Sequence, residues 1–366
     1  MSAPTVSFVV PCYKLAALLP TCLESILGQS YTDFEVLVMD DCSPDDTAGV
    51  VRACADLRVR HVRNDPNLGH LRNYNRGIEL SRGTYVWLIS ADDFLRSPRV
   101  LERYVATLER HPSVGYAFCP GYGVRDGVET RVLGRLRTTA DRDRLLRGEA
   151  LLDTLLLGNF VLTPSGLVRR SCYRDHGMFR LDLPWCGDWY LWCLFALHHD
   201  VAYFAEPMVC YREQHALSMT EKLTTERLDA CGAEELRVVR LLRDEARRLG
   251  RQRTANRCLE ALAHAYARTV ADDRYKGGSS AMNLAALETS LANEDLPPAV
   301  QRRLRARICA QVGSHCQRRG DRIGALTHYA RALADDPLMP KVAVKMGLAA
   351  LGRTGHFIHR TLVSLR

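Results

Sequence analysis

The stretch Val6-Ser7-Phe8-Val9-Val10-Pro11-Cys12-Tyr13 joins an apolar run, Val6–Val10, to a polar end. A run of β-branched and aromatic residues like this one is typical of a buried strand. The same change recurs where Phe34–Met39 leads into Asp40-Asp41, and again where Tyr85–Ile89 ends. Strand patterns separated by helical ones predict a parallel, doubly wound α/β sheet in this part of the chain.

Apolar residues between these strands recur with the 3.6-residue period of helices. We expect helices at Leu15–Gln29, Asp45–Asp56, Gly69–Ser81 and Ser97–Arg110, and two more strands at Val59–Val62 and Val114–Cys119. From about Met219 strand patterns end, and helices are expected at Thr225–Leu249, Arg253–Ala271, Met282–Ala292, Pro298–Arg318 and Ile323–Ala334. The length of 366 residues suits two domains, which we place at residues 1–220 and 221–366.

Composition narrows the class of protein. The formal charge of +8 comes mostly from arginine, and no RNA-binding signature accompanies it, so we expect no nucleic-acid partner. The 13 cysteines form no CxxC pair, which argues against a zinc knuckle or a redox pair. No apolar run reaches the roughly 18 residues of a membrane helix, and the N-terminus lacks a signal-peptide pattern. These features predict a protein of the reducing cytoplasm.

The C-terminal region leaves two questions open. The residues that match the spacing of one tetratricopeptide unit are Gly313, Ala325, Tyr329, Ala332 and Pro337, although ordinary bundles also place small residues where helices cross. Either arrangement suits a homo-oligomer or partner docking. The basic segment Lys341–Arg366 has no acidic residue, so it fits peripheral contact with the inner membrane or, as the pattern favours, a final helix packed on the bundle.

The polar clusters that follow the strands predict a ligand site, because parallel α/β sheets bind ligands beyond the carboxyl ends of their strands. A dinucleotide-binding fold would need G-x-G-x-x-G after the first strand, where this chain has Pro11–Ala16 without a glycine. We therefore exclude a dehydrogenase.

Asp92 and Asp93 are the strongest metal-ligand candidates. Adjacent carboxylates at a strand end repel one another unless a cation lies between them, and Mg²⁺ or Mn²⁺ prefers such oxygen ligands. The alternative is that one of them caps a short helix before Pro98.

Asp40 and Asp41 are candidates for nucleotide binding. A carboxylate at this strand end is able to accept a hydrogen bond from a base imide, and Tyr13 offers a ring for stacking. The alternative is a turn stabilised by Ser43 and Asp45.

Asp188 is the candidate general base. The aromatic residues around it in the sequence, including Trp185 and Trp189, would raise its pKa and offer surfaces for sugar stacking. The alternative, compatible with that role, is that Asp188 caps a helix over Trp189–His198. Asn159, Thr163 and Ser165 either bind a sugar or form a turn around Pro164.

Several motifs occur in the order found in one enzyme family. They are Val9-Val10-Pro11-Cys12-Tyr13, Ser25–Glu35, Asp40–Asp45, Asn67-Leu68-Gly69, Asn75-Arg76-Gly77, Ala91-Asp92-Asp93, Gly187-Asp188-Trp189 and Tyr211–His215. From Val6 to about Ser218 the chain resembles a family 2 glycosyltransferase. The resemblance implies a GT-A fold, a doubly wound mixed sheet flanked by helices, followed here by an all-α C-terminal domain.

The resemblance also implies an activity: inverting transfer of a sugar from a nucleotide donor, most often a UDP- or dTDP-sugar, with Mn²⁺ or Mg²⁺. The acceptor would be a carbohydrate, a lipid-linked or a protein hydroxyl in bacterial polysaccharide, glycolipid or glycoprotein assembly. The resemblance assigns nucleotide contacts to Pro11, Tyr13, Asp40, Asp41, Arg72 and Asp92, metal contacts to Asp93, Asp92 and His215, and the general base to Asp188. Lower-ranked candidates for the acceptor or sugar are Trp185, Trp189, Asn159 and Thr163.

Two positions depart from the family pattern. Ser90 stands where the metal motif commonly begins with Asp, and Gly187 stands where Glu usually precedes the catalytic Asp. They lend support to an alternative function, a catalytically weakened scaffold whose helical C-terminus binds partners. A nucleotidyltransferase is disfavoured, because no glycine-rich basic loop follows the first strand.

Overall fold

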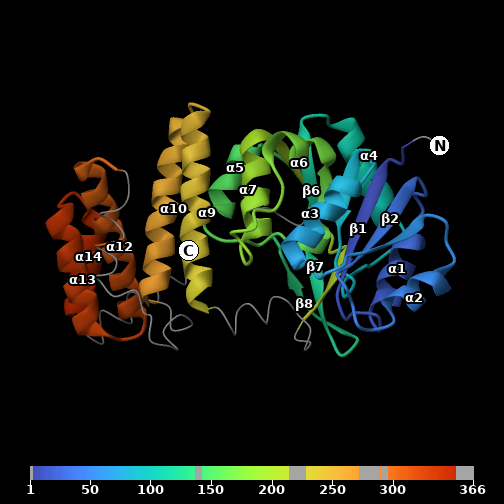
Figure 1. The fold of residues 1–366 in the computed structure, drawn as a ribbon. Coiled ribbons are helices and arrows are strands. Elements are labelled where there is room, and N and C mark those ends of the chain that lie inside the picture. The colour runs from blue at the N-terminus through green and yellow to red at the C-terminus, as the bar shows by residue number, and fades with distance from the viewer. Residues whose placement is uncertain (1–2, 137–141, 214–227, 272–288, 290–295, 352–366) are drawn as a thin grey trace. The chain divides into compact units, whose positions relative to one another are not determined.

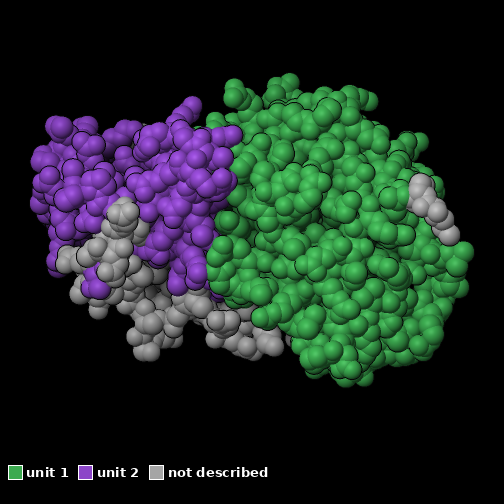
Figure 2. Space-filling view, turned by 45° about the horizontal axis from the view of Figure 1, so that its top comes forward, with its two compact units in different colours: residues 1–226 green, residues 227–366 purple. Residues whose placement is uncertain are grey.

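The computed structural model describes residues 3–136, 142–213, 228–271, 289 and 296–351. The chain divides into two compact units, Met1–Glu226 (unit 1) and Arg227–Arg366 (unit 2) (Figure 2). Among the described residues, no helix is long and apolar enough to cross a membrane. No disulfide joins any of the 13 cysteines.

Unit 1 is built on an eight-stranded mixed sheet in the order β3-β2-β1-β4-β10-β6-β11-β9 (Figure 1). Its strands are β1 (Val6–Cys12), β2 (Phe34–Asp40), β3 (Val59–Arg63), β4 (Tyr85–Leu88), β6 (Val114–Phe118), β9 (Arg144–Leu146), β10 (Leu167–Arg169) and β11 (Asp200–Tyr203). β1 to β4 are parallel to one another, as the alternation of strands and helices predicted. β10 runs antiparallel to β4 and β6, so the sheet is mixed, as in the GT-A expectation.

A second sheet has the order β5-β12-β7-β8. Its strands are β5 (Phe94–Leu95), β7 (Gly121–Arg125), β8 (Val128–Leu133) and β12 (Val209–Arg212). β5 follows directly after Asp92-Asp93 and pairs with β12. This pairing brings Arg212 beside the two carboxylates. The short helix that the helix-cap alternative requires after Asp93 is therefore absent, and that alternative is wrong for this pair.

The four expected helices of unit 1 are present, with shorter bounds: α1 (Leu19–Leu27), α2 (Thr47–Cys54), α3 (His70–Leu80) and α4 (Val100–Arg110). Three further helices follow, α5 (Gly148–Leu155), α6 (Arg170–His176) and α7 (Gly187–His198). α1 begins four residues later than predicted because Pro20, which has no N–H to offer, occupies its first turn. α2 is capped by Asp46, whose carboxylate accepts from the Gly49 N–H at 2.9 Å.

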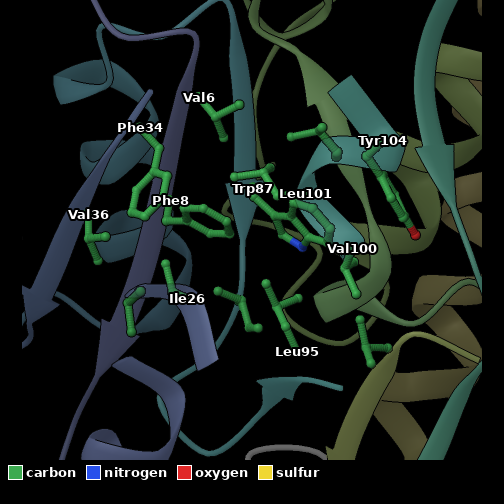
Figure 3. Close-up of a cluster of buried hydrophobic side chains, with 14 of the residues drawn as sticks. Val6, Phe8, Ile26, Phe34, Val36, Trp87, Leu95, Val100, Leu101 and Tyr104 are labelled. Atoms are coloured by element: carbon green, nitrogen blue, oxygen red, sulfur yellow. The ribbon is translucent and has the colours of Figure 1, made fainter. Parts of the chain in front are cut away.

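Both faces of the parallel strands are buried, which explains their continuous apolar runs. On one face Phe8 stacks on Trp87 at 5.5 Å, and Trp87 contacts Tyr104 of α4 at 4.7 Å (Figure 3). On the other face α3 packs against β1 and β2, where Gly77 lies so close that a Cβ would be 2.3 Å from Val9 Cγ1. Gly77 thus sets how closely α3 approaches the sheet.

Unit 2 is helical in every described element. Its helices are α9 (Leu228–Arg248), α10 (Gln252–Ala271), α12 (Pro298–Arg318), α13 (Arg322–Asp335) and α14 (Pro340–Ala350). The close crossing of α12 and α13 depends on Gly313, where a Cβ would be 2.7 Å from the Tyr329 ring. The tetratricopeptide assignment stays a prediction. The predicted helix Met282–Ala292 and most of the basic tail lie outside the described residues.

Candidate active site

A cleft of about 150 Å³ lies beyond the carboxyl ends of β1 and β4. Ligands bind at this edge of parallel α/β sheets. The cleft is lined by Pro11, His70, Leu71, Tyr74, Leu88, Ser90, Asp92, Asp93, Thr163, Pro164, Phe179, Pro184, Trp185, Gly187, Asp188 and Tyr211. The structure therefore brings together six of the predicted site residues: Pro11, Asp92, Asp93, Thr163, Trp185 and Asp188.

Asp92 and Asp93 form the acidic wall of the cleft. Asp93 is 3% exposed, and its Oδ1 accepts from the backbone N–H of Arg212 at 3.0 Å. The Arg212 Nε donates to the Asp92 carbonyl, also at 3.0 Å. Burial, together with the charge of Asp92, raises the pKa of Asp93 well above its usual range. A cation bound beside the pair would relieve this cost.

The residues present fit a divalent cation. Mg²⁺ is commonly held by one or two carboxylates plus substrate phosphates, and the cleft offers two adjacent carboxylates. Within the described ranges no group of three or more His, Cys, Asp or Glu side chains is arranged to hold a metal ion. The other ligands would then come from a diphosphate and water. His215, the predicted third protein ligand, lies outside the described residues.

Asp188 also lines the cleft, from the first turn of α7. Its Oδ2 accepts from Thr163 Oγ1 at 2.9 Å and from Asn159 Nδ2 at 3.1 Å, and its Oδ1 accepts from the Trp189 N–H at 2.6 Å. Burial raises the pKa of Asp188, and these hydrogen bonds offset part of the increase. A carboxylate has about four acceptor positions, so three hydrogen bonds leave room for an incoming hydroxyl.

The loop that carries Thr163 is anchored to the core. The Trp87 indole N–H donates to the Pro164 carbonyl at 2.7 Å, and the Tyr104 hydroxyl donates to the Ser165 carbonyl at 2.9 Å. Both donors are completely buried. This short 3₁₀ turn, Thr163–Ser165, is therefore held against Asp188 by the same aromatic cluster that forms the core (Figure 3).

Helix α3 holds the segment that leads into Asp188. Asn75 makes two hydrogen bonds with the backbone of Phe179, donating to its carbonyl at 2.8 Å and accepting from its N–H at 2.9 Å. His70 Nε2 donates to the Pro184 carbonyl at 3.1 Å. Because a carbonyl only accepts, this bond requires a proton on Nε2. Burial lowers the pKa of His70, so the neutral ring is favoured.

The sequence reasoning overlooked His70 and Tyr74. They lie at positions i and i+4 of α3 and therefore share one face of the helix. Their position after the Asn67-Leu68-Gly69 motif was the available signal. Both rings line the cleft, and Tyr74 contacts His70 and Phe179 edge to face, with centroids 5.6 and 5.4 Å apart.

Asp40 and Asp41 are buried beside the cleft and bonded within the protein. Asp40 accepts from the Ser43 N–H at 2.8 Å, from Arg63 Nη1 at 2.8 Å and from His61 Nε2 at 3.0 Å. Burial opposes ionisation of Asp40, but these partners prevail and lower its pKa. In this structure Asp40 stabilises a turn, as the alternative interpretation of this residue proposed. The contact of Asp40 with a nucleotide stays a prediction.

Asp41 ties the loop before α3 to the end of β2. Its carboxylate accepts from Asn64 Nδ2 at 2.7 Å, from the Leu68 N–H at 2.8 Å and from the Gly69 N–H at 2.9 Å. The side chain is 3% exposed. In this arrangement Asp41 shapes the loop, and a contact with a nucleotide base also stays a prediction.

Asp41→Ala is expected to lower the free energy of unfolding by roughly 3 kcal/mol, because three donors, the buried Asn64 amide among them, lose their acceptor. Urea denaturation measures the change. Asp46→Ala, which removes the α2 cap, is the control and should cost about 1 kcal/mol. Equal losses in the two variants would show that the Asp41 network adds no more than an ordinary helix cap.

The structure places other predicted residues outside the cleft lining. Tyr13 is 42% exposed with Lys14 Nζ 5.1 Å from its ring centroid, and Arg72 and Asn159 are also exposed. Trp189 is 3% exposed, and its indole N–H donates to the Leu155 carbonyl at 2.7 Å. Since α7 turns Trp189 into the core, Trp185 is the tryptophan that faces a ligand here.

The two departures from the family pattern both line the cleft. A Cβ on Gly187 would lie 3.2 Å from Phe179 Cδ1, so a larger residue would press on the ring that contacts Tyr74. The Ser90 carbonyl accepts from the Asp93 N–H at 2.9 Å, so this residue shapes the turn that presents the carboxylates.

Comparison with known proteins identifies the family. Residues 7–171 match Glycosyl transferase family 2. The chain is 35% identical over 220 residues to a PGL/p-HBAD biosynthesis glycosyltransferase of Mycobacterium tuberculosis (strain ATCC 25177 / H37Ra), covering 59% of this chain and 76% of that protein. The chain belongs to glycosyl transferase family 2. This glycosyltransferase is also 31% identical over 237 residues to the uncharacterized protein MT1568 of M. tuberculosis (strain CDC 1551 / Oshkosh), covering 61% of this chain and 72% of that protein.

The fold of this family 2 glycosyltransferase is similar to the crystal structure of S. aureus TarS 1–349 in complex with UDP-GlcNAc. The TM-score is 0.59 at 18% sequence identity, and the match covers 92% of this chain and 89% of TarS 1–349. The predicted GT-A architecture and helical C-terminal region are confirmed by this likeness.

Proposed function

We propose that this glycosyltransferase moves a sugar, with inversion at the anomeric carbon, from a UDP- or dTDP-sugar to a hydroxyl of a carbohydrate, lipid-linked or protein acceptor. One observation carries the proposal: a single cleft is lined by an acidic pair, Asp92 and Asp93, and by a third carboxylate, Asp188. A donor whose diphosphate lies at the pair would present its anomeric carbon toward Asp188.

Asp188 would act as the general base. The acceptor hydroxyl gives its proton to the free position on the Asp188 carboxylate as its oxygen attacks the anomeric carbon. The bond from that carbon to the diphosphate oxygen breaks, and its electron pair leaves with the diphosphate. Attack from the face opposite the leaving group inverts the configuration.

Asp93 and Asp92 would hold Mn²⁺ or Mg²⁺ at the diphosphate. Such a cation supplies positive charge that stabilises the leaving diphosphate. Arg212 holds the two acidic residues in place through its backbone N–H and its Nε. The UDP-GlcNAc bound in the TarS structure and the glycosyltransferase named for PGL/p-HBAD biosynthesis support a nucleotide-sugar donor.

The proposed base predicts the pH dependence of the reaction. The rate should fall when Asp188 becomes protonated. Because the pKa of Asp188 is raised, this should happen at a higher pH than for an ordinary aspartate. The Thr163 hydroxyl lowers this pKa, so Thr163→Val should move the acid limb of kcat upward in pH. An acid limb that Thr163→Val leaves in place would argue against Asp188 as the titrating base.

A turnover screen tests the proposed function. The full chain is incubated with UDP-glucose, UDP-GlcNAc, dTDP-glucose or GDP-mannose, with Mn²⁺ or with EDTA, and release of the nucleoside diphosphate is measured, with water taking the sugar as acceptor. We expect metal-dependent release from a uracil or thymine donor. Absence of release from every donor would instead favour the scaffold alternative.

A further inference from the structure

The Tyr74 side chain lines the same cleft as the three carboxylates. Tyr74 lines the cleft together with Asp92, Asp93 and Asp188, and the charges of all three carboxylates act on its hydroxyl. Within the described residues no hydrogen bond to this hydroxyl is formed. The other polar residue that this helix contributes to the cleft, His70, is already bonded to the Pro184 carbonyl.

The ring of Tyr74 is held firmly in place. His70 contacts it from the same helix and Phe179 from the segment that leads into Asp188, with interplanar angles of 72° and 74°. Phe179 is itself fixed by the two hydrogen bonds of Asn75. A hydroxyl on a fixed ring binds a ligand with little further loss of side-chain entropy.

The location of the hydroxyl indicates which part of a donor it meets. In a nucleotide sugar the anomeric carbon is bonded directly to the diphosphate, and the rest of the transferred sugar extends from that carbon. A donor whose diphosphate lies at Asp92 and Asp93 and whose anomeric carbon faces Asp188 would therefore place its sugar among these three carboxylates. The charges of all three act on the Tyr74 hydroxyl, and a protonated phenol both donates and accepts hydrogen bonds.

We propose that Tyr74 is a substrate-contact residue whose hydroxyl hydrogen-bonds a hydroxyl of the transferred sugar and so contributes to donor-sugar selection. This inference rests on the proposed function. It differs from the predicted nucleotide contacts, because it assigns to α3 a contact with the sugar rather than with the base or diphosphate. The burial of Tyr74 raises its pKa, which keeps the phenol protonated beside three carboxylates.

Tyr74→Phe tests the inference, since it removes the hydroxyl and keeps the ring contacts with His70 and Phe179. Calorimetry with Mn²⁺ compares UDP with UDP-glucose and UDP-GlcNAc, dTDP with dTDP-glucose, and GDP with GDP-mannose. For the nucleotide sugar that the wild type binds, Tyr74→Phe should lower the affinity about tenfold. For the free diphosphate it should change the affinity by less than about twofold. Tyr31→Phe, at the opposite edge of the sheet, is the matched control and should change neither.

Each other outcome overturns the inference in a distinguishable way. Equal binding of the nucleotide sugar by wild type and Tyr74→Phe would show that the hydroxyl makes no sugar contact. If Tyr74→Phe lowers the affinity for the free diphosphate by the same factor, the hydroxyl contacts the diphosphate instead. If the wild type binds none of these compounds, the proposed function fails, and this inference fails with it.

A second measurement begins with the wild-type protein, so it does not depend on the folding of a variant. Singly deoxygenated analogues of the bound donor sugar are titrated against the wild type, and one position should lose about tenfold in affinity. In Tyr74→Phe that same analogue should bind as well as the parent sugar, because the two groups form one contact. Wild-type binding that is equal for every analogue would contradict the inference.

Discussion

Asp188→Asn is expected to lower the rate of sugar transfer by roughly 10²- to 10⁴-fold, the range for loss of a positioned general base. The amide has nearly the same shape as the carboxylate and keeps an oxygen that accepts from Thr163 or Trp189. It has no basic site for the acceptor proton. Release of nucleoside diphosphate in the presence of acceptor measures the loss.

Binding of the free nucleoside diphosphate should survive in Asp188→Asn, because the diphosphate is expected at Asp92 and Asp93 and not at Asp188. Asp153→Asn, on helix α5 outside the cleft lining, is the matched control and should retain wild-type turnover. Full turnover in Asp188→Asn would mean that another group accepts the proton.

Asp93→Asn is expected to abolish metal-dependent diphosphate binding and to lower turnover by about 10³-fold, since a metal contributes several kcal/mol to stabilising the leaving group. Asn keeps the oxygen that accepts from the Arg212 N–H, so the turn should persist. Calorimetry with UDP or dTDP and Mn²⁺ measures the binding. Asp126→Asn, in the exposed turn after β7, is the matched control.

The same variant should be more stable than the wild type in metal-free buffer at neutral pH. The folded-state pKa of Asp93 is raised above its unfolded value, so its contribution to stability is lost as the pH rises through the folded pKa. At a pH above its unfolded pKa, Asp93 therefore lowers the stability of the folded protein, whereas Asn has no charge to bury. A higher melting temperature together with lost binding would identify Asp93 as a functional carboxylate. Lower stability with normal binding would contradict this role.

Much of the fold was predictable because its strands are long, apolar and buried on both faces. β1 and β2 were expected within two residues of their observed ends, and the polar residues that follow them indicated the functional edge of the sheet. β10 was not predicted, since three residues, Leu167–Arg169, carry too little pattern. Its antiparallel pairing depends on contacts with β4 and β6 that are distant in sequence.

The candidate site was predictable where a motif fixes a side chain at a strand end, as for Asp92 and Asp93. On helices the prediction was weaker, because the face that a residue occupies depends on tertiary packing. Arg72 and Trp189 were predicted contacts, yet Arg72 is exposed and Trp189 is buried beneath α5. Tyr74, two positions after Arg72, lines the cleft instead.

The central claim is that the cleft binds a nucleoside diphosphate through a metal held by Asp93 and Asp92. Thermal denaturation of the full chain with UDP, dTDP, GDP or CDP, with and without Mn²⁺, tests it most directly. At about 100 times Kd, one diphosphate should stabilise the protein by roughly 2.7 kcal/mol only when Mn²⁺ is present, and this stabilisation should disappear in Asp93→Asn. If no diphosphate raises the melting temperature of the wild type, with or without Mn²⁺, the claim is wrong.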